Sequence, residues 1–366
     1  MKHRDRVMKA LNRERPDRCP MQISFTPEFA VRLKTDMRQA GHRVHNPHGH
    51  GNTYELERAI GEDMLLTSVG WANSYYANET YSGGRESYID EWGVGWRNQR
   101  YETRFGAGTY TEMVSHPLAD AAALDSYRPP DPARPELYAD AERMIQTYKD
   151  EYWIVGVTVT TIFETAWALR GLEQMLLDLV EDPALAKQIF DIPFQYHLAA
   201  AKRLVELGVD MIWTGDDVGA QHAMFISPAT WRRLLKPYLA EFFAVLKAMN
   251  PRLVIAYHSD GNIEPIVPEL IEVGVDVLNP IQPAAMDPAR LADKYRDRLC
   301  FWGTIDEQHT LPYGSPESVR SEIRSRIETV GRDGGLILGP THHVQLDTPM
   351  ENFWAMVGAI TGEERG

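Results

Sequence analysis

The segment Leu253–Gln282 reads LVIAYHSDGNIEPIVPELIEVGVDVLNPIQ and indicates the fold. It begins with an apolar run that is typical of a buried strand and ends in a polar tip, His258–Asp260. Apolar residues at helical spacing follow, until Gly274 ends the predicted helix. A second apolar run ends in a tip that contains Asn279 and Gln282. This order predicts a parallel α/β fold, in which sites form at the carboxyl ends of the strands.

The rest of the chain repeats this pattern. Eight apolar runs, nearly all separated by helical segments, predict a closed (β/α)8 barrel, a TIM barrel, in a single domain over residues 1–366. An open doubly wound sheet is the alternative, which the lack of a G-x-G-x-x-G motif after an early strand disfavours. The predicted strands are Cys19–Phe25, Met64–Ser68, Trp153–Val157, Asp210–Thr214, Leu253–Tyr257, Val275–Leu278, Leu299–Trp302 and Leu336–Leu338.

One insertion, about residues 70–150, follows the second predicted strand. Two aromatic-rich runs, Ser87–Trp96 and Arg97–Phe105, predict an inserted β-hairpin. Helical segments are expected at Pro117–Tyr127 and Pro135–Tyr148. The insertion is long enough to form a lid or a pocket wall, and a dimer contact or a plain decoration is also compatible with the sequence.

Composition excludes several classes of partner. A net charge of -14 disfavours nucleic acid, and the sequence has no apolar stretch of membrane-spanning length. The N-terminus lacks the apolar region of a signal peptide, so we expect a cytoplasmic protein. The two cysteines, Cys19 and Cys300, provide no disulfide framework and are interpreted as buried hydrophobic residues. A homodimer is possible.

In a barrel, polar residues from five strand ends would converge on one rim. Asp216 and Asp217 follow the fourth predicted strand and are the candidate catalytic carboxylates, although a helix cap is about as plausible. The candidate substrate-binding residues on this rim are Tyr257, Asn279, Gln282, Asp306 and His343.

His258, Asp260 and His342 are the predicted metal ligands. Two imidazoles and a carboxylate leave a fourth position open, which is the pattern of catalytic zinc, and iron or manganese would also bind. His343 is expected to point away from its neighbour. A helix cap formed by Asp260, or metal-free binding of a polar substrate, are the alternatives. The histidine-rich tract Gly41–His50 is interpreted as a surface loop because it contains Gly and Pro.

Beyond these patterns, three segments resemble the uroporphyrinogen decarboxylase superfamily: Leu253–Gln282, Trp302–Asp306 and His342–Asn352. The resemblance covers most of the chain from about Trp153 onward. It implies a (β/α)8 barrel and one of two activities. One branch decarboxylates tetrapyrroles, and the other contains zinc-dependent methyltransferases that move methyl groups between corrinoids and thiols.

The chain resembles the methyltransferase branch more closely. The decarboxylase branch carries an arginine-rich motif after strand one and an aspartate after strand two, but Pro20–Glu28 has no arginine and Thr67–Gly70 no aspartate. The methyltransferase branch has His-x-Cys after strand five and a cysteine near strand eight. Here His258, Asp260 and His342 lie at or near these positions. Harder ligands make a metal more Lewis-acidic, which suits an oxygen substrate better than a thiol.

The leading interpretation is therefore a zinc-assisted methyltransferase or demethylase. It would act with a corrinoid carried by a partner protein and with a small methylated substrate. Asp216 or Asp217 would position the substrate or move a proton. The alternatives are a carboxy-lyase for a tetrapyrrole or another carboxylated substrate, and a non-catalytic corrinoid or tetrapyrrole binder.

Overall fold

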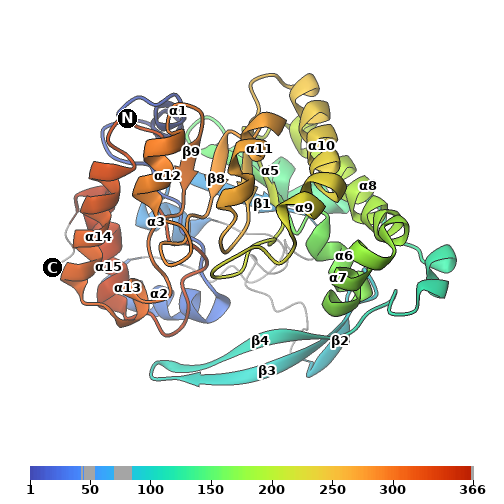
Figure 1. The fold of residues 1–366 in the computed structure, drawn as a ribbon. Helices are drawn as coiled ribbons and strands as arrows, with labels where there is room; N and C mark the ends of the chain where they lie inside the picture. The colour runs from blue at the N-terminus through green and yellow to red at the C-terminus, as the bar shows by residue number, and fades with distance from the viewer. Residues whose placement is uncertain (43, 45–53, 70–84, 364–366) are drawn as a thin grey trace.

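The computed structural model describes residues 1–42, 44, 54–69 and 85–363, so most of the histidine-rich tract lies outside the described residues. The described chain forms a curled parallel sheet, with strand order β1-β5-β6-β7-β8-β9-β10, in a TIM-barrel-like fold (Figure 1). The strands are β1 (Met64–Ser68), β5 (Trp153–Val159), β6 (Met211–Gly215), β7 (Val254–His258), β8 (Val277–Asn279), β9 (Cys300–Trp302) and β10 (Leu336–Ile337).

The predicted first strand, Cys19–Phe25, is not a regular strand. It forms isolated parallel bridges, one of them between Met21 and Leu338, beyond β10. On its other side the Met21 carbonyl accepts a hydrogen bond from the backbone N–H of Asp63, just before β1. The segment therefore lies between the two edge strands. A continuous ladder does not form because Pro20 has no N–H to donate and β10 has only two residues.

Successive side chains along each strand belong to two different packed layers. Val155, Trp213 and Ala256 belong to the cluster inside the curled sheet. Their strand neighbours, such as Ile212 and Ile255, belong to the larger cluster between the sheet and the helices. Successive side chains of a strand face opposite sides, so continuous apolar strands bury both faces of the sheet.

Helices cover the outside of the sheet, and several start at residues that favour a helix N-terminus. Ser315, for example, forms a capping box with Ser318 at the start of α14. The helices are α1 (His3–Leu11), α2 (Pro27–Gln39), α3 (Glu55–Ile60), α5 (Ala139–Tyr148), α6 (Phe163–Arg170), α7 (Leu172–Glu181), α8 (Pro183–Leu207), α9 (Pro228–Leu234), α10 (Lys236–Met249), α11 (Val267–Val273), α12 (Pro288–Tyr295), α13 (Thr310–Tyr313), α14 (Pro316–Thr329) and α15 (Met350–Thr361).

The insertion carries a three-stranded antiparallel sheet of β2 (Ser87–Ile89), β3 (Gly95–Thr103) and β4 (Gly106–Ser115). The strand β4 was not expected from the sequence. The expected helix at Pro117–Tyr127 is a 3₁₀ helix over Ala121–Ser126. The long arm of β3 and β4 lies along the bottom of the molecule in Figure 1.

The tip of this arm contacts the body of the protein. The backbone N–H of Thr109 donates to the Glu28 carboxylate on α2, at 3.0 Å. The Arg104 guanidinium donates to the carbonyl of Pro312 on α13. The arm is thus anchored at its far end as well as at its base.

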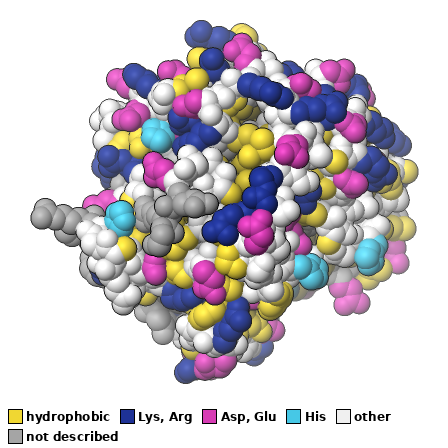
Figure 2. All heavy atoms as spheres, turned by 90° about the vertical axis from the view of Figure 1, so that its left-hand side faces the viewer, with side chains coloured by type: hydrophobic (Ala, Val, Ile, Leu, Met, Phe, Trp, Pro, Cys, Tyr) yellow, Lys and Arg dark blue, Asp and Glu magenta, His cyan; other side chains and the backbone are white. Residues whose placement is uncertain are grey.

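The surface around α14 and α15 carries charges of both signs, which are interspersed in Figure 2. Ion pairs such as Arg324–Glu317, at 2.6 Å, account for part of this pattern. Among the helices in the described part of the chain, none combines the length and the apolar character needed to cross a bilayer.

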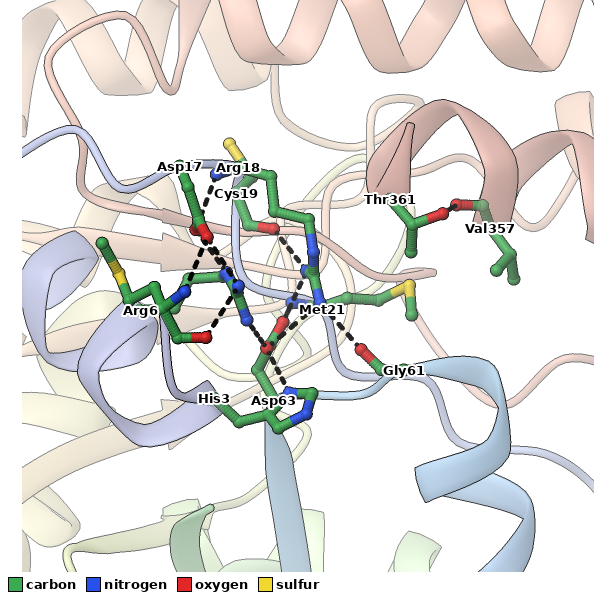
Figure 3. Close-up of polar contacts among 11 residues, drawn as sticks. His3, Arg6, Asp17, Arg18, Cys19, Met21, Gly61, Asp63, Val357 and Thr361 are labelled. Carbon is green, nitrogen blue, oxygen red and sulfur yellow. Dashed lines mark hydrogen bonds and ion pairs between the residues drawn. The ribbon is translucent and has the colours of Figure 1, made fainter. Parts of the chain in front are cut away.

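One buried carboxylate, that of Asp63, ties the N-terminal helix to the barrel (Figure 3). Asp63 is fully buried just before β1. Its oxygens accept hydrogen bonds from Arg6 at 2.5 Å, Arg18 at 2.6 Å and the backbone N–H of Met21 at 2.8 Å, and lie 2.8 Å from His3 Nδ1. His3 and Arg6 lie on α1, and Arg18 and Met21 lie in the segment between α1 and α2.

We expect the substitution Asp63→Asn to destabilise the fold by about 3–5 kcal/mol, because two largely buried guanidinium groups would lose their shared carboxylate. Urea unfolding followed by circular dichroism measures this change in the free energy of unfolding. The control is Asp333→Asn, which removes an exposed ion-pair partner of Arg332 and should cost less than about 1 kcal/mol. Equal effects of the two substitutions would contradict the role given to Asp63.

Candidate active site

A cavity of about 520 Å³ lies at the carboxyl ends of the strands, beneath the inserted sheet. Its walls come from the strand ends and from the loop after β10, and Trp96 and Thr111 of the inserted sheet close one side. It is lined by Gln22, Ser24, Trp96, Thr111, Val159, Thr160, Glu164, Trp213, Asp217, His258, Asn279, Pro340, Thr341, His342 and His343.

The strand register explains why several predicted residues meet here. Gly215 at the end of β6 pairs with His258 of β7, which pairs with Asn279 of β8. Gly215 has a φ of +138°, and a Cβ there would come within 2.0 Å of the His258 carbonyl oxygen. Glycine at this position therefore permits the close approach of the two strand ends that brings Asp217 beside His258.

Asp217, His258 and Asp260 form a compact group in which potential ligand atoms lie within 4.8 Å of one another. Asp217 Oδ1 lies 3.6 Å from His258 Nε2 and accepts a hydrogen bond from the backbone N–H of Asp260, at 2.7 Å. Sequence reasoning placed Asp217 among the catalytic residues rather than among the ligands. The structure brings it into the same group as two of the predicted metal ligands.

Asn279 fixes the tautomer of His258. The Asn279 Nδ2 group donates to the carbonyl of Trp302 at 3.1 Å, so its Oδ1 atom faces His258. His258 Nδ1 lies 2.9 Å from that oxygen and must therefore be the protonated nitrogen. The Nε2 lone pair is left facing Asp217. This is the arrangement by which an outer hydrogen bond orients a metal-binding imidazole.

His342 lies across the cavity from this group. Its ring centroid is 6.4 Å from that of His258, and it is not part of the compact group. Burial lowers its pKa, which favours the neutral imidazole.

The expectation that His343 points away from His342 is wrong. The two Nδ1 atoms are 3.2 Å apart, and both residues line the cavity. The alternation expected of an extended strand does not apply, because β10 has already ended at Ile337 and this segment is irregular.

The donor set fits a divalent cation. Asp260 Oδ1 is buried and makes no hydrogen bond within the described part of the chain. Burial raises the pKa of Asp260, because few water molecules reach its charged form. A cation between Asp260, Asp217 and His258 Nε2 would compensate this charge. Hard carboxylates and imidazoles suit zinc, iron or manganese.

Glu164 is a site residue that the sequence analysis missed. It lies in the first turn of α6, lines the cavity, and accepts a hydrogen bond from the backbone N–H of Asp217, at 3.0 Å. Burial and the nearby Asp217 carboxylate raise its pKa well above the usual value, which favours the protonated carboxyl group. Its one signal in the sequence is a position shortly after the third predicted strand.

Asp216 does not line the cavity. Its Oδ1 atom accepts hydrogen bonds from the backbone N–H groups of Ile162, at 2.9 Å, and Glu164, at 3.0 Å, at the start of α6. Burial raises its pKa to about 6. The capping alternative therefore describes Asp216 better than the catalytic one, although it caps the preceding helix in the chain rather than the next one.

Three predicted substrate-binding residues also lie outside the cavity wall. Tyr257 is buried between the sheet and the helices, because its strand neighbour His258 takes the inward position. Gln282 accepts a hydrogen bond from the backbone N–H of Gly261 at 2.6 Å. Asp306 accepts one from the backbone N–H of Gln308, two residues further along the chain. These side chains support the loops at the rim.

Comparison with known proteins identifies similar chains. A methylcobamide:CoM methyltransferase MtaA from Methanosarcina barkeri is 28% identical over 176 residues, which is 48% of each chain. The match thus spans about half the length of that relative. A uroporphyrinogen decarboxylase from Anaeromyxobacter sp. is 22% identical over 267 residues, covering 70% of this chain and 72% of the relative.

The fold comparison extends over the whole chain. A methyltransferase structure from Methanosarcina mazei superposes with a TM-score of 0.66 at 19% identity and covers 99% of both chains. This similarity supports the TIM-barrel-like fold. The family model for uroporphyrinogen decarboxylase (URO-D) matches residues 101–362, most of the chain. The chain therefore belongs to the uroporphyrinogen decarboxylase family.

Proposed function

We propose that this protein is a metal-dependent methyltransferase or demethylase that acts with a corrinoid protein on a small methylated compound. The observation that carries the proposal is the compact group of Asp217, His258 and Asp260, in which His258 presents a lone pair and Asp260 an uncompensated oxygen. We assign these three residues as ligands of one divalent ion, with His342 as the alternative to Asp217, so that a fourth position stays open to the substrate, and zinc is the preferred candidate. The similarity to the MtaA methyltransferase supports this choice.

A bound divalent ion would act as a Lewis acid toward the heteroatom that gives or receives the methyl group. Side chains of the protein would position the ligands and shape the cavity in which the reaction takes place. Asn279 holds the His258 ring in place, and Trp96 and Thr111 of the inserted sheet line one side of the cavity.

Glu164 is suited to supply a proton. If a corrinoid served as the methyl acceptor for a methyl ether, cleavage of the carbon–oxygen bond would leave an oxygen that needs a proton. Glu164 lies at the cavity wall, and its raised pKa favours the protonated form. A carboxyl group with a raised pKa can act as such a general acid.

The decarboxylase alternative is less compatible with the charges of the cavity. No lysine or arginine lines it within the described residues. A tetrapyrrole that carries several carboxylates would lack the charge-assisted hydrogen bonds that such groups require.

The proposal is tested directly by incubating the purified protein with reduced cobalamin and a set of small methyl ethers, alcohols and amines. Formation of methylcobalamin, followed by its absorbance, would support methyl transfer. Absence of methyl transfer with every compound, in a protein that carries its metal, would count against it.

The metal assignment predicts the behaviour of two variants. His258→Ala should lose the ion without unfolding, because the residue lies at a strand end rather than in the core. Asp260→Cys should bind zinc more tightly than wild type, since thiolate is the softer ligand. Elemental analysis after gel filtration measures the metal content of each variant, and its thermal midpoint reports the fold.

The control for these variants is His309→Ala, which removes an exposed imidazole at the rim, 3.5 Å from Asp306. It should retain its metal. A wild-type protein that takes up no divalent ion when zinc, iron or manganese is supplied would refute the assignment, as would full metal content in His258→Ala.

We also expect no conversion of uroporphyrinogen to coproporphyrinogen. The reason is the lack of guanidinium or ammonium groups at the described cavity wall. Chromatography of the porphyrins after oxidation measures the products, with an authentic uroporphyrinogen decarboxylase as a parallel control. Efficient conversion by this protein would favour the carboxy-lyase alternative.

A further inference from the structure

A second, smaller cavity of about 120 Å³ lies between the inserted sheet and α6. It adjoins the main cavity, since Trp96, Thr160 and Glu164 line both. The two cavities therefore lie next to each other. The side cavity is lined by Asp90, Trp92, Val94, Trp96, Met113, Thr160, Glu164, Thr165, Trp167, Ala168 and Leu169.

The lining of the side cavity is unusually rich in tryptophan. The lining includes the indole rings of three residues, Trp92, Trp96 and Trp167. It also includes the thioether of Met113 and the carboxylate of Asp90. No lysine, arginine or histidine lines it within the described residues. Indole rings beside a carboxylate, with no basic side chain among the described lining residues, match the residue types that recognise methylated ammonium groups.

Asp90 strengthens this preference. Its Oδ2 atom accepts a hydrogen bond from the Trp96 indole Nε1–H at 2.7 Å, and its Oδ1 atom accepts from the backbone N–H groups of Trp92 and Val94, at 2.9 Å each. Burial raises the pKa of Asp90, and these three donors oppose that shift by stabilising the ionised form. An indole that donates to a carboxylate is polarised by it, so its ring attracts a cation more strongly.

We propose that the side cavity binds a methylated ammonium group, and that the substrate of the neighbouring site belongs to the class of small molecules that carry such a group. The second part rests on the proposed function, whereas the binding itself does not. An anionic group would be repelled by Asp90, and a neutral alkyl group would gain nothing from its charge.

The connection of the two cavities sets where the rest of the molecule lies. Trp96 and Glu164 line both the side cavity and the main cavity, whose wall also includes Asp217 and His258. A substrate anchored by its ammonium group would thus present its other end to the candidate metal ligands. The insertion that supplies Asp90, Trp92 and Trp96 then determines the substrate class.

The test is isothermal titration calorimetry on the full chain, after removal of metal with a chelator. Choline is compared with its neutral carbon isostere, in which a tert-butyl group replaces the trimethylammonium group. We expect choline to bind about tenfold more tightly, because only the charged group gains from the indole faces and the carboxylate. Equal or tighter binding of the isostere would overturn the proposal, as would the absence of saturable choline binding.

Variants identify the residues responsible. Asp90→Asn and Trp167→Leu should each reduce the preference for choline over the isostere to about twofold or less. The control Tyr110→Leu changes an exposed aromatic residue on the same inserted sheet, outside the side cavity, and should keep the wild-type preference. A full preference in both Asp90→Asn and Trp167→Leu, in folded protein, would contradict the assignment of the site.

The outcome is separable from that of the proposed function. The metal-binding variant His258→Ala should still prefer choline, since its side chain lies outside the side cavity. Choline binding without methyl transfer would leave the side cavity established and the activity refuted. Methyl transfer without a preference for choline would support the proposed activity and overturn the proposal for the side cavity.

Discussion

The alternation of side chains along buried parallel strands determines most of this structure. On β7, His258 is directed into the barrel mouth while its neighbour Tyr257 is buried against the helices. A shift of one residue in register would exchange them and remove the imidazole from the cavity. The pairing of Gly215 with His258, where no Cβ fits, holds the register at this point.

This constraint also explains which parts of the fold could be predicted from the sequence. The strand Met64–Ser68 starts with three apolar residues directly after Asp63, so its existence follows from local pattern. The segment Cys19–Phe25 has a similar composition, but its hydrogen bonding depends on β10, a partner of two residues far away in the chain. Local pattern does not contain that information.

The difference between local sequence pattern and contacts made only in the folded chain also applies to the site. Asp217, His258, Asn279 and His342 were predictable because each follows a strand, and parallel strands bring their ends together. Glu164 was not, because its role comes from burial beside Asp217, which only the folded chain produces.

Asp216 and Gln282 show the opposite error, in which a polar side chain at a strand end serves the backbone rather than a ligand. The start of a helix and the loop after a strand leave backbone N–H groups unpaired, and a nearby carboxylate or amide oxygen that accepts from them is not available to a substrate. Position at the rim therefore identifies a set of candidates, and the hydrogen bonds of each side chain decide among them.

The charges of the cavity connect the insertion with the chemistry. A family that contains decarboxylases of polycarboxylated tetrapyrroles would be expected to line its site with cations, yet the described walls here combine carboxyl groups, imidazoles and indoles. Such walls favour a metal ion at the strand ends and a cationic or neutral ligand beside it. The candidate metal ligands come from the ends of β6 and β7 and the loop after β10, whereas the insertion supplies Trp92 and Trp96 and α6 supplies Trp167. The insertion thus contributes to the walls of both cavities, while the group of Asp217, His258 and Asp260 comes from the strand ends alone.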